Sequence, residues 1–166
     1  MEVVKTKKED VLKIDRIFDQ AKAYLKSKGI DQWQIGYPNA STVLEDIETD
    51  TSYVLKDNNE VIGTMRFLID TDPDYIDIDG KWLSNGEYGV IHRIAISDDL
   101  KGNGYANVLL NHSIALCKEY GVHSLRIDTH EMNLSMRSFL KKHGFVECGI
   151  VYIRKTDRRI AYELLF

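Results

Sequence analysis

The segment from residue 87 to residue 121 constrains the fold more than any other part of the chain. It begins with the apolar, β-branched run EYGVIHRIAIS, continues through the polar turn DDLKGNG, and then places apolar residues at helical spacing as far as Gly121. A strand of this composition is typically buried on both faces, within a sheet that helices cover. The segment therefore predicts a protein of the α/β or α+β class in which this strand is central.

Further helices and strands are expected on both sides of this segment. Helical spacing and capping residues predict helices over residues 7–28, 103–120 and 134–142, and a short helix that ends at Ile47 and is capped by Asn39 or Ser41. Strands are predicted over residues 52–57, 61–69, 87–97, 123–129, 145–153 and 159–165. Thr6 and Glu9 have the spacing of a capping box for the first helix, and Asn58-Asn59 marks a hairpin turn. We expect a single domain over residues 1–166, with a central mixed, mostly antiparallel sheet of about six to seven strands flanked by about four helices.

The composition excludes several classes of protein. The 166 residues carry 22 basic and 26 acidic side chains, and this acidic balance disfavours nucleic acids and membranes as partners. Cys117 and Cys148 have neither the spacing of metal ligands nor that of a disulfide framework. We therefore expect reduced thiols, no bound metal and a cytoplasmic location. The N-terminal residues contain no apolar stretch, so neither secretion nor membrane anchoring is expected.

The turn between the central strand and the following helix has the layout of an anion site. Gly102 and Gly104 let the backbone approach a ligand closely, and the free N–H groups at the start of the helix, residues 103–106, face the same place. Lys101 adds a full positive charge. The turn lacks the Gly-Lys-Ser/Thr ending of a Walker loop, and Asn107 occupies the third position of a dinucleotide GxGxxG fingerprint.

Two motifs in this part of the chain resemble those of the GNAT acetyltransferase superfamily. The first is KGNGYA, in which Lys101, Gly104 and Ala106 fill the positions of the loop that binds the pyrophosphate of acetyl-CoA. The second is NLSMRSFLKKHGF, which begins at Asn133 and ends at Phe145. Both have the expected order and separation, and they fall on the strand, turn and helix predicted from periodicity alone.

The resemblance implies an N-acetyltransferase that moves an acetyl group from acetyl-CoA to a primary amine by direct attack, without a covalent enzyme intermediate. It implies that a main-chain N–H of the central strand stabilises the developing oxyanion. Three groups of residues would bind the co-substrate: the strand residues Ile94, Ala95 and Ile96, the loop residues Lys101, Gly102, Asn103, Gly104, Tyr105 and Ala106, and Asn133, Arg137 and Lys142 on the later helix.

The chain departs from the family pattern at both proton-transfer positions. Leu140 stands where a tyrosine commonly protonates the thiolate, and Val90 stands near the position of the usual glutamate base. The acid could instead be Tyr105, Tyr88, Tyr152 or water. For the base we favour His92, which shares a strand face with Val90, Ile94 and Ile96 because side chains alternate along a strand. The rival base is His130, in the run DTHE at the end of the next strand.

Several of these residues also have purely structural interpretations. His92 could be a hydrogen-bonded core histidine, and Arg93, on the opposite face, is more often an ion-pair partner for an aspartate. Trp33 and Tyr37 fit core packing slightly better than the wall of an acceptor pocket. Asn133 also fits an N-cap, and Lys142 fits a solvated helix face. Two other functions stay open: a non-catalytic acyl-CoA sensor that has lost its acid and base, and a nucleotide-binding domain.

The two parts of the sequence differ in net charge, and this difference indicates which binding partners to expect. Residues 1–100 carry 12 basic and 20 acidic side chains, whereas residues 101–166 carry 10 and 6. Five aspartates lie within the loop of residues 70–79. They either form a solvated loop without a ligand or attract a cationic acceptor. We expect a small amine or peptide acceptor, first of all a cationic one. The final strand, which ends in LLF, could pair between two copies in a homodimer.

Overall fold

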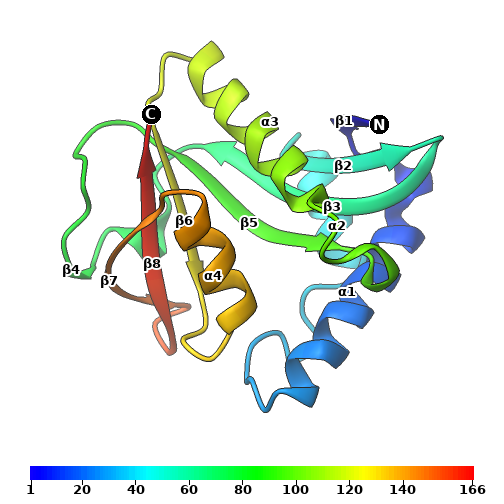
Figure 1. The fold of residues 1–166 in the computed structure, drawn as a ribbon, viewed down its shortest axis with the longest axis horizontal. Helices are drawn as coiled ribbons and strands as arrows, with labels where there is room; N and C mark the ends of the chain where they lie inside the picture. The colour runs from blue at the N-terminus through cyan, green and yellow to red at the C-terminus, as the bar shows by residue number, and fades with distance from the viewer. The chain divides into compact units, whose positions relative to one another are not determined.

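The computed structural model, which covers residues 1–166, contains eight β-strands and four α-helices (Figure 1). The elements in the first part of the chain are β1 (Glu2–Lys5), α1 (Val11–Ser27), α2 (Ala40–Glu48), β2 (Ser52–Asp57), β3 (Glu60–Ile69) and β4 (Asp79–Gly80). They are followed by β5 (Gly89–Ile96), α3 (Tyr105–Glu119), β6 (Ser124–Thr129), α4 (Leu134–Lys142), β7 (Val146–Ile153) and β8 (Asp157–Leu165). None of the helices combines the length and the apolar composition needed to cross a bilayer.

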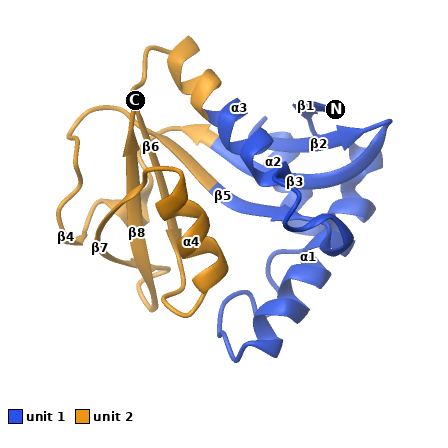
Figure 2. Cartoon of the chain, viewed as in Figure 1, with its two compact units in different colours: residues 1–67, 92–113 blue, residues 68–91, 114–166 orange.

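The chain divides into two compact units (Figure 2). Unit 1 comprises residues 1–67 and 92–113, and unit 2 comprises residues 68–91 and 114–166. Strand β5 and helix α3 each continue from one unit into the other.

The strand order is β1-β2-β3-β5-β6-β8-β7-β4. Strand β5 runs parallel to β6, with Gly89 opposite Leu125, whereas the pairs β1–β2, β2–β3, β6–β8, β7–β8 and β4–β7 are antiparallel. The predicted fold class, with a mixed and mostly antiparallel sheet and about four helices, is thereby confirmed. The sheet has more strands than the six to seven predicted, because β1 and β4 were not expected.

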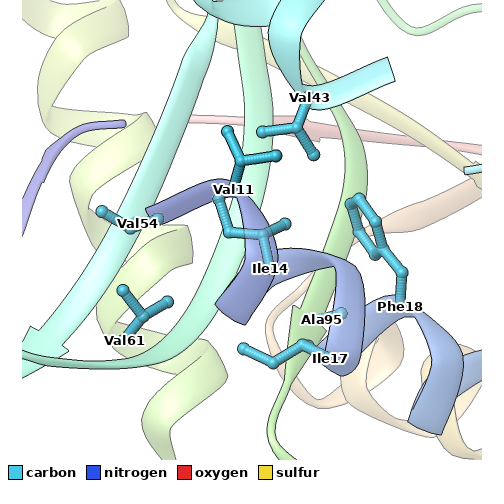
Figure 3. Close-up of a cluster of buried hydrophobic side chains, with 8 residues drawn as sticks. All are labelled: Val11, Ile14, Ile17, Phe18, Val43, Val54, Val61 and Ala95. Carbon is cyan, nitrogen blue, oxygen red and sulfur yellow. The ribbon is translucent and has the colours of Figure 1, made fainter. Parts of the chain in front are cut away.

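In unit 1, helices α1 and α2 pack on one face of the strands (Figure 3). The buried cluster consists of Val11, Ile14, Ile17 and Phe18 from α1, Val43 from α2, Val54 from β2, Val61 from β3 and Ala95 from β5. Helix α3 covers the other face, where the ring of His112 contacts that of Tyr53 at 5.5 Å. Neighbouring residues of a strand point to opposite faces. Tyr53 therefore faces α3, whereas Val54 faces α1 and α2.

In unit 2, the two faces of the strands are covered by different segments. Tyr75, Tyr88, Val90, Val151 and Ala161 form a buried cluster on one face. The next residue of β8, Tyr162, points the other way and accepts a hydrogen bond from Arg137 of α4 at 3.1 Å. Helix α4 therefore packs on the face opposite this cluster.

The start of the first helix differs from the prediction. Thr6 does not cap it, because its hydroxyl accepts a buried hydrogen bond from Ser52 at 2.6 Å. A short 3-10 turn (Lys8–Asp10) precedes α1, and the carboxylate of Asp10 accepts from the N–H of Lys7 at 3.0 Å. The predicted capping box of Thr6 and Glu9 is therefore wrong. The predicted cap at Asn39 is confirmed, since its side chain accepts from the N–H of Thr42 at 3.2 Å.

Candidate functional site

Strand β5 is the central element of the candidate site in unit 1. All of its residues are buried except His92 and Arg93, which lie in the middle of the strand and are half-buried. Gly63 of β3 lets the strands approach closely, since a Cβ there would lie 2.6 Å from Ile96 Cδ1 and 3.2 Å from the Ala95 carbonyl oxygen. A larger residue at position 63 would displace β5, which carries Ile94, Ala95 and Ile96, the predicted binding strand.

The loop after β5 is open to solvent and has a fixed conformation. Gly102 and Gly104 both have φ of +82°, in the left-handed region that favours glycine. A Cβ at Gly102 would meet nothing within 4 Å, so the backbone conformation, not the space, requires glycine there. The loop is attached to α1, because Gln20 Oε1 accepts from the N–H of Asp98 at 3.0 Å. An exposed backbone in this conformation directs N–H groups outward and can bind an anion.

The loop leads directly into the first turn of α3, which begins at Tyr105. The first N–H groups of a helix have no partner within the helix, and the helix dipole makes this end positive. The ammonium of Lys101 forms an ion pair with Asp98 and lies 4.7 Å from the ring centroid of Tyr24. Residues 101–104 are exposed and lead into the positive end of α3, where Tyr105 and Ala106 are half-buried, and this arrangement suits the anion site that the sequence predicts.

The other predicted binding residues lie in unit 2, along α4. Asn133 is the N-cap of α4, where it accepts from the N–H of Met136 at 3.3 Å. Arg137 already has several partners within unit 2: it donates to Tyr162 at 3.1 Å and to the Glu131 carbonyl at 3.0 Å. Lys142 is exposed in the last turn of α4. The cap function predicted for Asn133 is present, and a role of these three residues in binding stays a prediction.

The two candidate bases have different surroundings. In unit 1, His92 is half-buried in β5 beside Arg93, whose φ of +52° interrupts the regular alternation of the strand. In unit 2, His130 follows β6, and its Nδ1 accepts from the N–H of Met132 at 3.1 Å. Nδ1 of His130 is thus engaged with the main chain, and the choice between His92 and His130 as the base stays a prediction.

The positions of the missing acid and base are occupied by core residues. Leu140 and Val90 are both fully buried within unit 2. Of the three alternative tyrosines, Tyr88 accepts from the N–H of Asp72 at 3.0 Å and packs on Arg126, whereas Tyr152 is largely exposed. Tyr105 lies in the first turn of α3, next to the loop.

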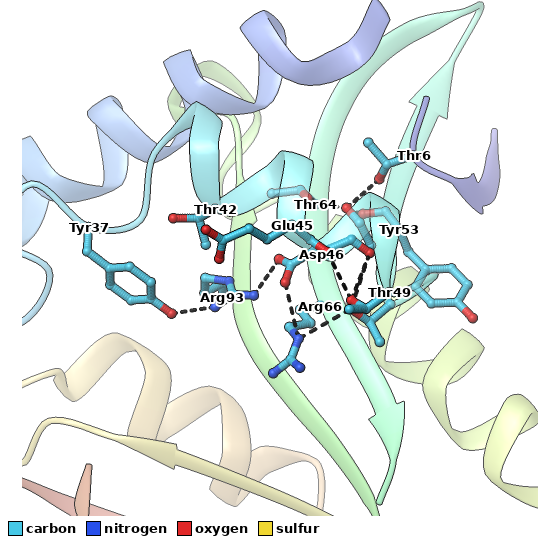
Figure 4. A network of polar contacts seen from close by, with 12 residues as sticks. Thr6, Tyr37, Thr42, Glu45, Asp46, Thr49, Tyr53, Thr64, Arg66 and Arg93 are labelled. Atoms are coloured by element: carbon cyan, nitrogen blue, oxygen red, sulfur yellow. Dashed lines mark hydrogen bonds and ion pairs between the residues drawn. The ribbon is translucent and has the colours of Figure 1, made fainter. Parts of the chain in front are cut away.

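Arg93 makes the ion pair with an aspartate that the sequence predicts, and the partner is Asp46 of α2 (Figure 4). Its guanidinium also donates to the hydroxyl of Tyr37. Trp33 packs edge-on against Phe18 at 5.8 Å, as core packing predicts. Asp46 was not foreseen, because 47 positions separate it from Arg93 and no local pattern connects them.

Some of the aspartates in the loop of residues 70–79 accept hydrogen bonds from main-chain N–H groups of the protein. Asp72 accepts from the N–H of Asp74 at 2.9 Å, and Asp74 accepts from the N–H of Arg154 at 3.3 Å. Asp77 and Asp79 are exposed. The first hydrogen bond is typical of an Asx turn and the second joins the loop to the turn after β7, so the two account for part of the run without a ligand.

Comparisons with known proteins point to one group of enzymes. The sequence model described as the acetyltransferase (GNAT) family matches residues 16–145. Over 102 residues, the chain is 30% identical to streptothricin acetyltransferase A of Bacillus subtilis strain 168. That match covers 61% of this chain and 56% of the relative, so the chain spans little more than half the length of this curated relative.

Solved structures with the same fold cover nearly the whole chain. A GNAT-family acetyltransferase from Streptococcus agalactiae 2603 is 29% identical, with a TM-score of 0.88 over 99% of this chain and 95% of that one. Another from Listeria monocytogenes 4b F2365 is 22% identical, with a TM-score of 0.73 over 99% and 94% of the two chains. The second likeness concerns the fold alone. Both extend over β5, the glycine-containing loop and α3.

Proposed function

The chain belongs to the acetyltransferase (GNAT) family, and from this premise we propose that it transfers the acetyl group of acetyl-CoA to a primary amine of a small molecule or peptide. The observation that carries the proposal is the open loop of residues 101–106 between the buried strand β5 and the positive end of α3.

The residues of the loop suit the pyrophosphate of acetyl-CoA. The positive φ of Gly102 and Gly104 gives the backbone the shape of an anion-binding concavity, and the start of α3 adds the helix dipole. Lys101, which is paired with Asp98, supplies a positive charge beside them. Within unit 2, the family resemblance proposes Asn133, Arg137 and Lys142 as further residues that bind the co-substrate. When bound, acetyl-CoA supplies the activated acetyl thioester.

The amine must lose a proton before or while it attacks the thioester carbonyl. A lysine-like amine has a pKa of ~10.4, so forming the free base at neutral pH costs about 4 to 5 kcal/mol. His92 accepts this proton, directly or through a water molecule, and a main-chain N–H among Ile94, Ala95 and Ile96 stabilises the oxyanion. As the carbon–sulfur bond breaks, Tyr105 or water returns a proton to the thiolate.

Replacing His92 with alanine should lower kcat about 100-fold at neutral pH, because the base is lost. The deficit should shrink as the pH approaches the pKa of the acceptor amine, while the Kd for acetyl-CoA stays within about twofold. His130→Ala, the matched variant of the rival base, should retain nearly full turnover. Steady-state rates across pH measure this, and unchanged turnover of His92→Ala at every pH would reject the assignment.

Replacing Lys101 with alanine should weaken acetyl-CoA binding about fivefold at low salt and less at high salt, because an exposed charge is screened. Asp98→Asn should instead strengthen acetyl-CoA binding, since it releases Lys101 from its ion pair. The control is Lys13→Ala, because Lys13 is a similarly exposed lysine of unit 1 that is paired with Glu60 at 2.9 Å. Calorimetry at two ionic strengths measures all three, and equal affinity of Lys101→Ala and wild type would mean that the phosphates bind elsewhere.

A second candidate function is a non-catalytic acyl-CoA sensor. The observation that favours it is that core side chains, Leu140 and Val90, occupy the positions of the usual acid and base. An assay of thiol release from acetyl-CoA separates the two functions. Tight acetyl-CoA binding without amine-dependent release of CoA would favour the sensor, whereas binding of ATP alone would reject both.

The acceptor is best sought with a panel of amines. The opposite charges of the two halves of the sequence favour a cationic acceptor, although the aspartate loop is partly engaged in its own turns. The name of the Bacillus subtilis relative adds streptothricin to the panel. The panel therefore contains streptothricin, polyamines, aminoglycosides, amino acids and peptide N-termini.

A further inference from the structure

Arg93 has an unusual backbone conformation in the middle of the candidate catalytic strand. Its φ is +52°, in the left-handed region, although the residues on both sides belong to β5. A residue other than glycine stays in this region only when its surroundings hold it there. Arg93 lies between His92, the proposed base, and Ile94, a candidate oxyanion donor. The backbone at Arg93 therefore sets the relative directions of the His92 imidazole and the Ile94 N–H.

The surroundings that hold Arg93 are polar and largely shielded from solvent (Figure 4). One terminal nitrogen of its guanidinium binds the carboxylate of Asp46, and the other donates to the hydroxyl of Tyr37. The second oxygen of Asp46 binds Arg66 Nε at 3.2 Å. The side chains of Arg93 and Asp46 are only 9% and 13% exposed. This network joins β5 to α2, to β3 and to the segment between α1 and α2.

Stability alone explains this network poorly. Arg93 Nε is buried without a hydrogen-bond partner, which is unfavourable for a donor of a charged group. Asp46 lies near the C-terminal end of α2, where the helix dipole disfavours a negative charge. Together with the positive φ, three unfavourable features converge on one place beside His92. Buried ion pairs often stabilise a fold no better than apolar residues would, so another role must account for this one.

We propose that Asp46 and Arg93 are positioning residues that fix the turn of β5 and so aim the His92 side chain and the Ile94 N–H for acetyl transfer. The inference rests on the proposed function. Neither residue needs to touch the reacting atoms. Tyr37 ties the same network to the segment of residues 31–39, so its hydroxyl contributes to the same alignment with a smaller effect.

The test compares Asp46→Asn with Asp10→Asn. Asp10 is a matched control, because it is also a buried aspartate of unit 1 in an ion pair, with Lys56 at 2.8 Å and exposures of 5% and 12%. Asp46→Asn should lower kcat about 30- to 100-fold while KM for acetyl-CoA stays within about twofold, since a small displacement of reacting groups has effects of this size. Asp10→Asn should keep kcat within about twofold. Tyr37→Phe, which removes the hydroxyl that accepts from Arg93, should lower kcat about threefold to tenfold.

A second readout does not depend on activity. In amide NMR spectra of the full chain, Asp46→Asn should shift the resonances of Ile94 and Ala95, and Asp10→Asn should leave them in place. If wild-type protein shows no amine-dependent release of CoA, the proposed function fails, and the NMR comparison still tests whether Asp46 sets the strand. Wild-type kcat in Asp46→Asn and Tyr37→Phe, or unmoved Ile94 and Ala95 resonances in Asp46→Asn, would overturn the inference.

Discussion

Replacing Gly104 with valine should weaken acetyl-CoA binding on the order of 100-fold. Gly104 has φ of +82°, a conformation that a β-branched residue adopts only with strain. A Cβ there meets only Asn107 Nδ2, at an ordinary 3.5 Å, so the substitution alters the backbone without a clash inside the protein. The loop would relax away from the shape that directs its N–H groups at the pyrophosphate, and the valine side chain would occupy the approach of the ligand.

The matched control is Gly121→Val. Gly121 follows the other end of α3, has φ of +72°, and a Cβ there would meet nothing within 4 Å. Both variants therefore introduce comparable strain at a comparably open position, but only Gly104 belongs to the proposed phosphate loop. Calorimetry should give near wild-type affinity for Gly121→Val. Equal affinities of the two variants for acetyl-CoA would show that the loop does not bind the co-substrate.

Replacing Glu163 with alanine should lower the free energy of unfolding by about 3 to 5 kcal/mol, because it leaves a buried arginine without its counter-charge. Glu163 of β8 is completely buried and accepts hydrogen bonds from Ser124 at 2.6 Å, from Arg126 at 3.3 Å and from the N–H of Leu83 at 2.5 Å. The guanidinium of Arg126 lies 3.8 Å from the ring centroid of Tyr88. Urea unfolding measures the loss.

The same carboxylate should give the stability a defined pH dependence. Burial raises the pKa of Glu163, but the hydrogen bonds from Ser124 and Ser84 and the charge of Arg126 outweigh it, so the net pKa lies below the ordinary value. The ionised form is therefore favoured by folding. Its contribution is fully present above the unfolded pKa of ~4.3 and is lost as the pH falls through the lower folded pKa.

The variant Glu163→Gln isolates this effect. The stability difference between wild type and Glu163→Gln should be largest at neutral pH and shrink as the pH falls below about 4. Glu147→Gln is the control. Glu147 lies on the neighbouring strand β7, but its side chain is 52% exposed and its ion pair with Arg137 is long, at 3.5 Å. A difference for Glu163→Gln that stays constant from neutral to acid pH would contradict the assignment.

Much of the fold could be predicted because its determinants are local. The cap at Asn39, the Asn58-Asn59 turn and the helix over residues 134–142 each depend on a few adjacent residues, and all three are present in the structure. In the turn, Asn58 and Asn59 have φ of +48° and +66°, the conformation that asparagine tolerates best.

The wrong predictions concern elements whose structure depends on residues far away in the sequence. Strand β1 is four residues long and is defined by its pairing with β2, and β4 has two residues that are paired with β7. Thr6 and Glu9 have the spacing of a capping box, but a hydrogen bond from Ser52 occupies the Thr6 hydroxyl. In both cases a tertiary contact decided the outcome and was not visible in the local sequence.

The candidate site shows the same division. The glycine loop and the start of α3 form a continuous segment, so the sequence predicts them well. The Arg93 network joins β5 to three other segments, and only the need of Arg93 for some aspartate could be foreseen. The positive φ of Arg93 has no sequence signal, because arginine rarely adopts it and the surroundings impose it. The residues proposed to position the site are therefore harder to predict than those proposed to bind the co-substrate.

The most direct test of the central claim is to follow the acetyl group itself. Purified protein is incubated with isotope-labelled acetyl-CoA and the amine panel, and the products are then treated with hydroxylamine, which cleaves thioesters and oxygen esters but not amides. The account predicts label in an amine of the panel, stable to hydroxylamine, with one free CoA thiol released for each acetyl group transferred. Tight binding of acetyl-CoA without transfer of label to any amine, or label that hydroxylamine removes, would contradict it.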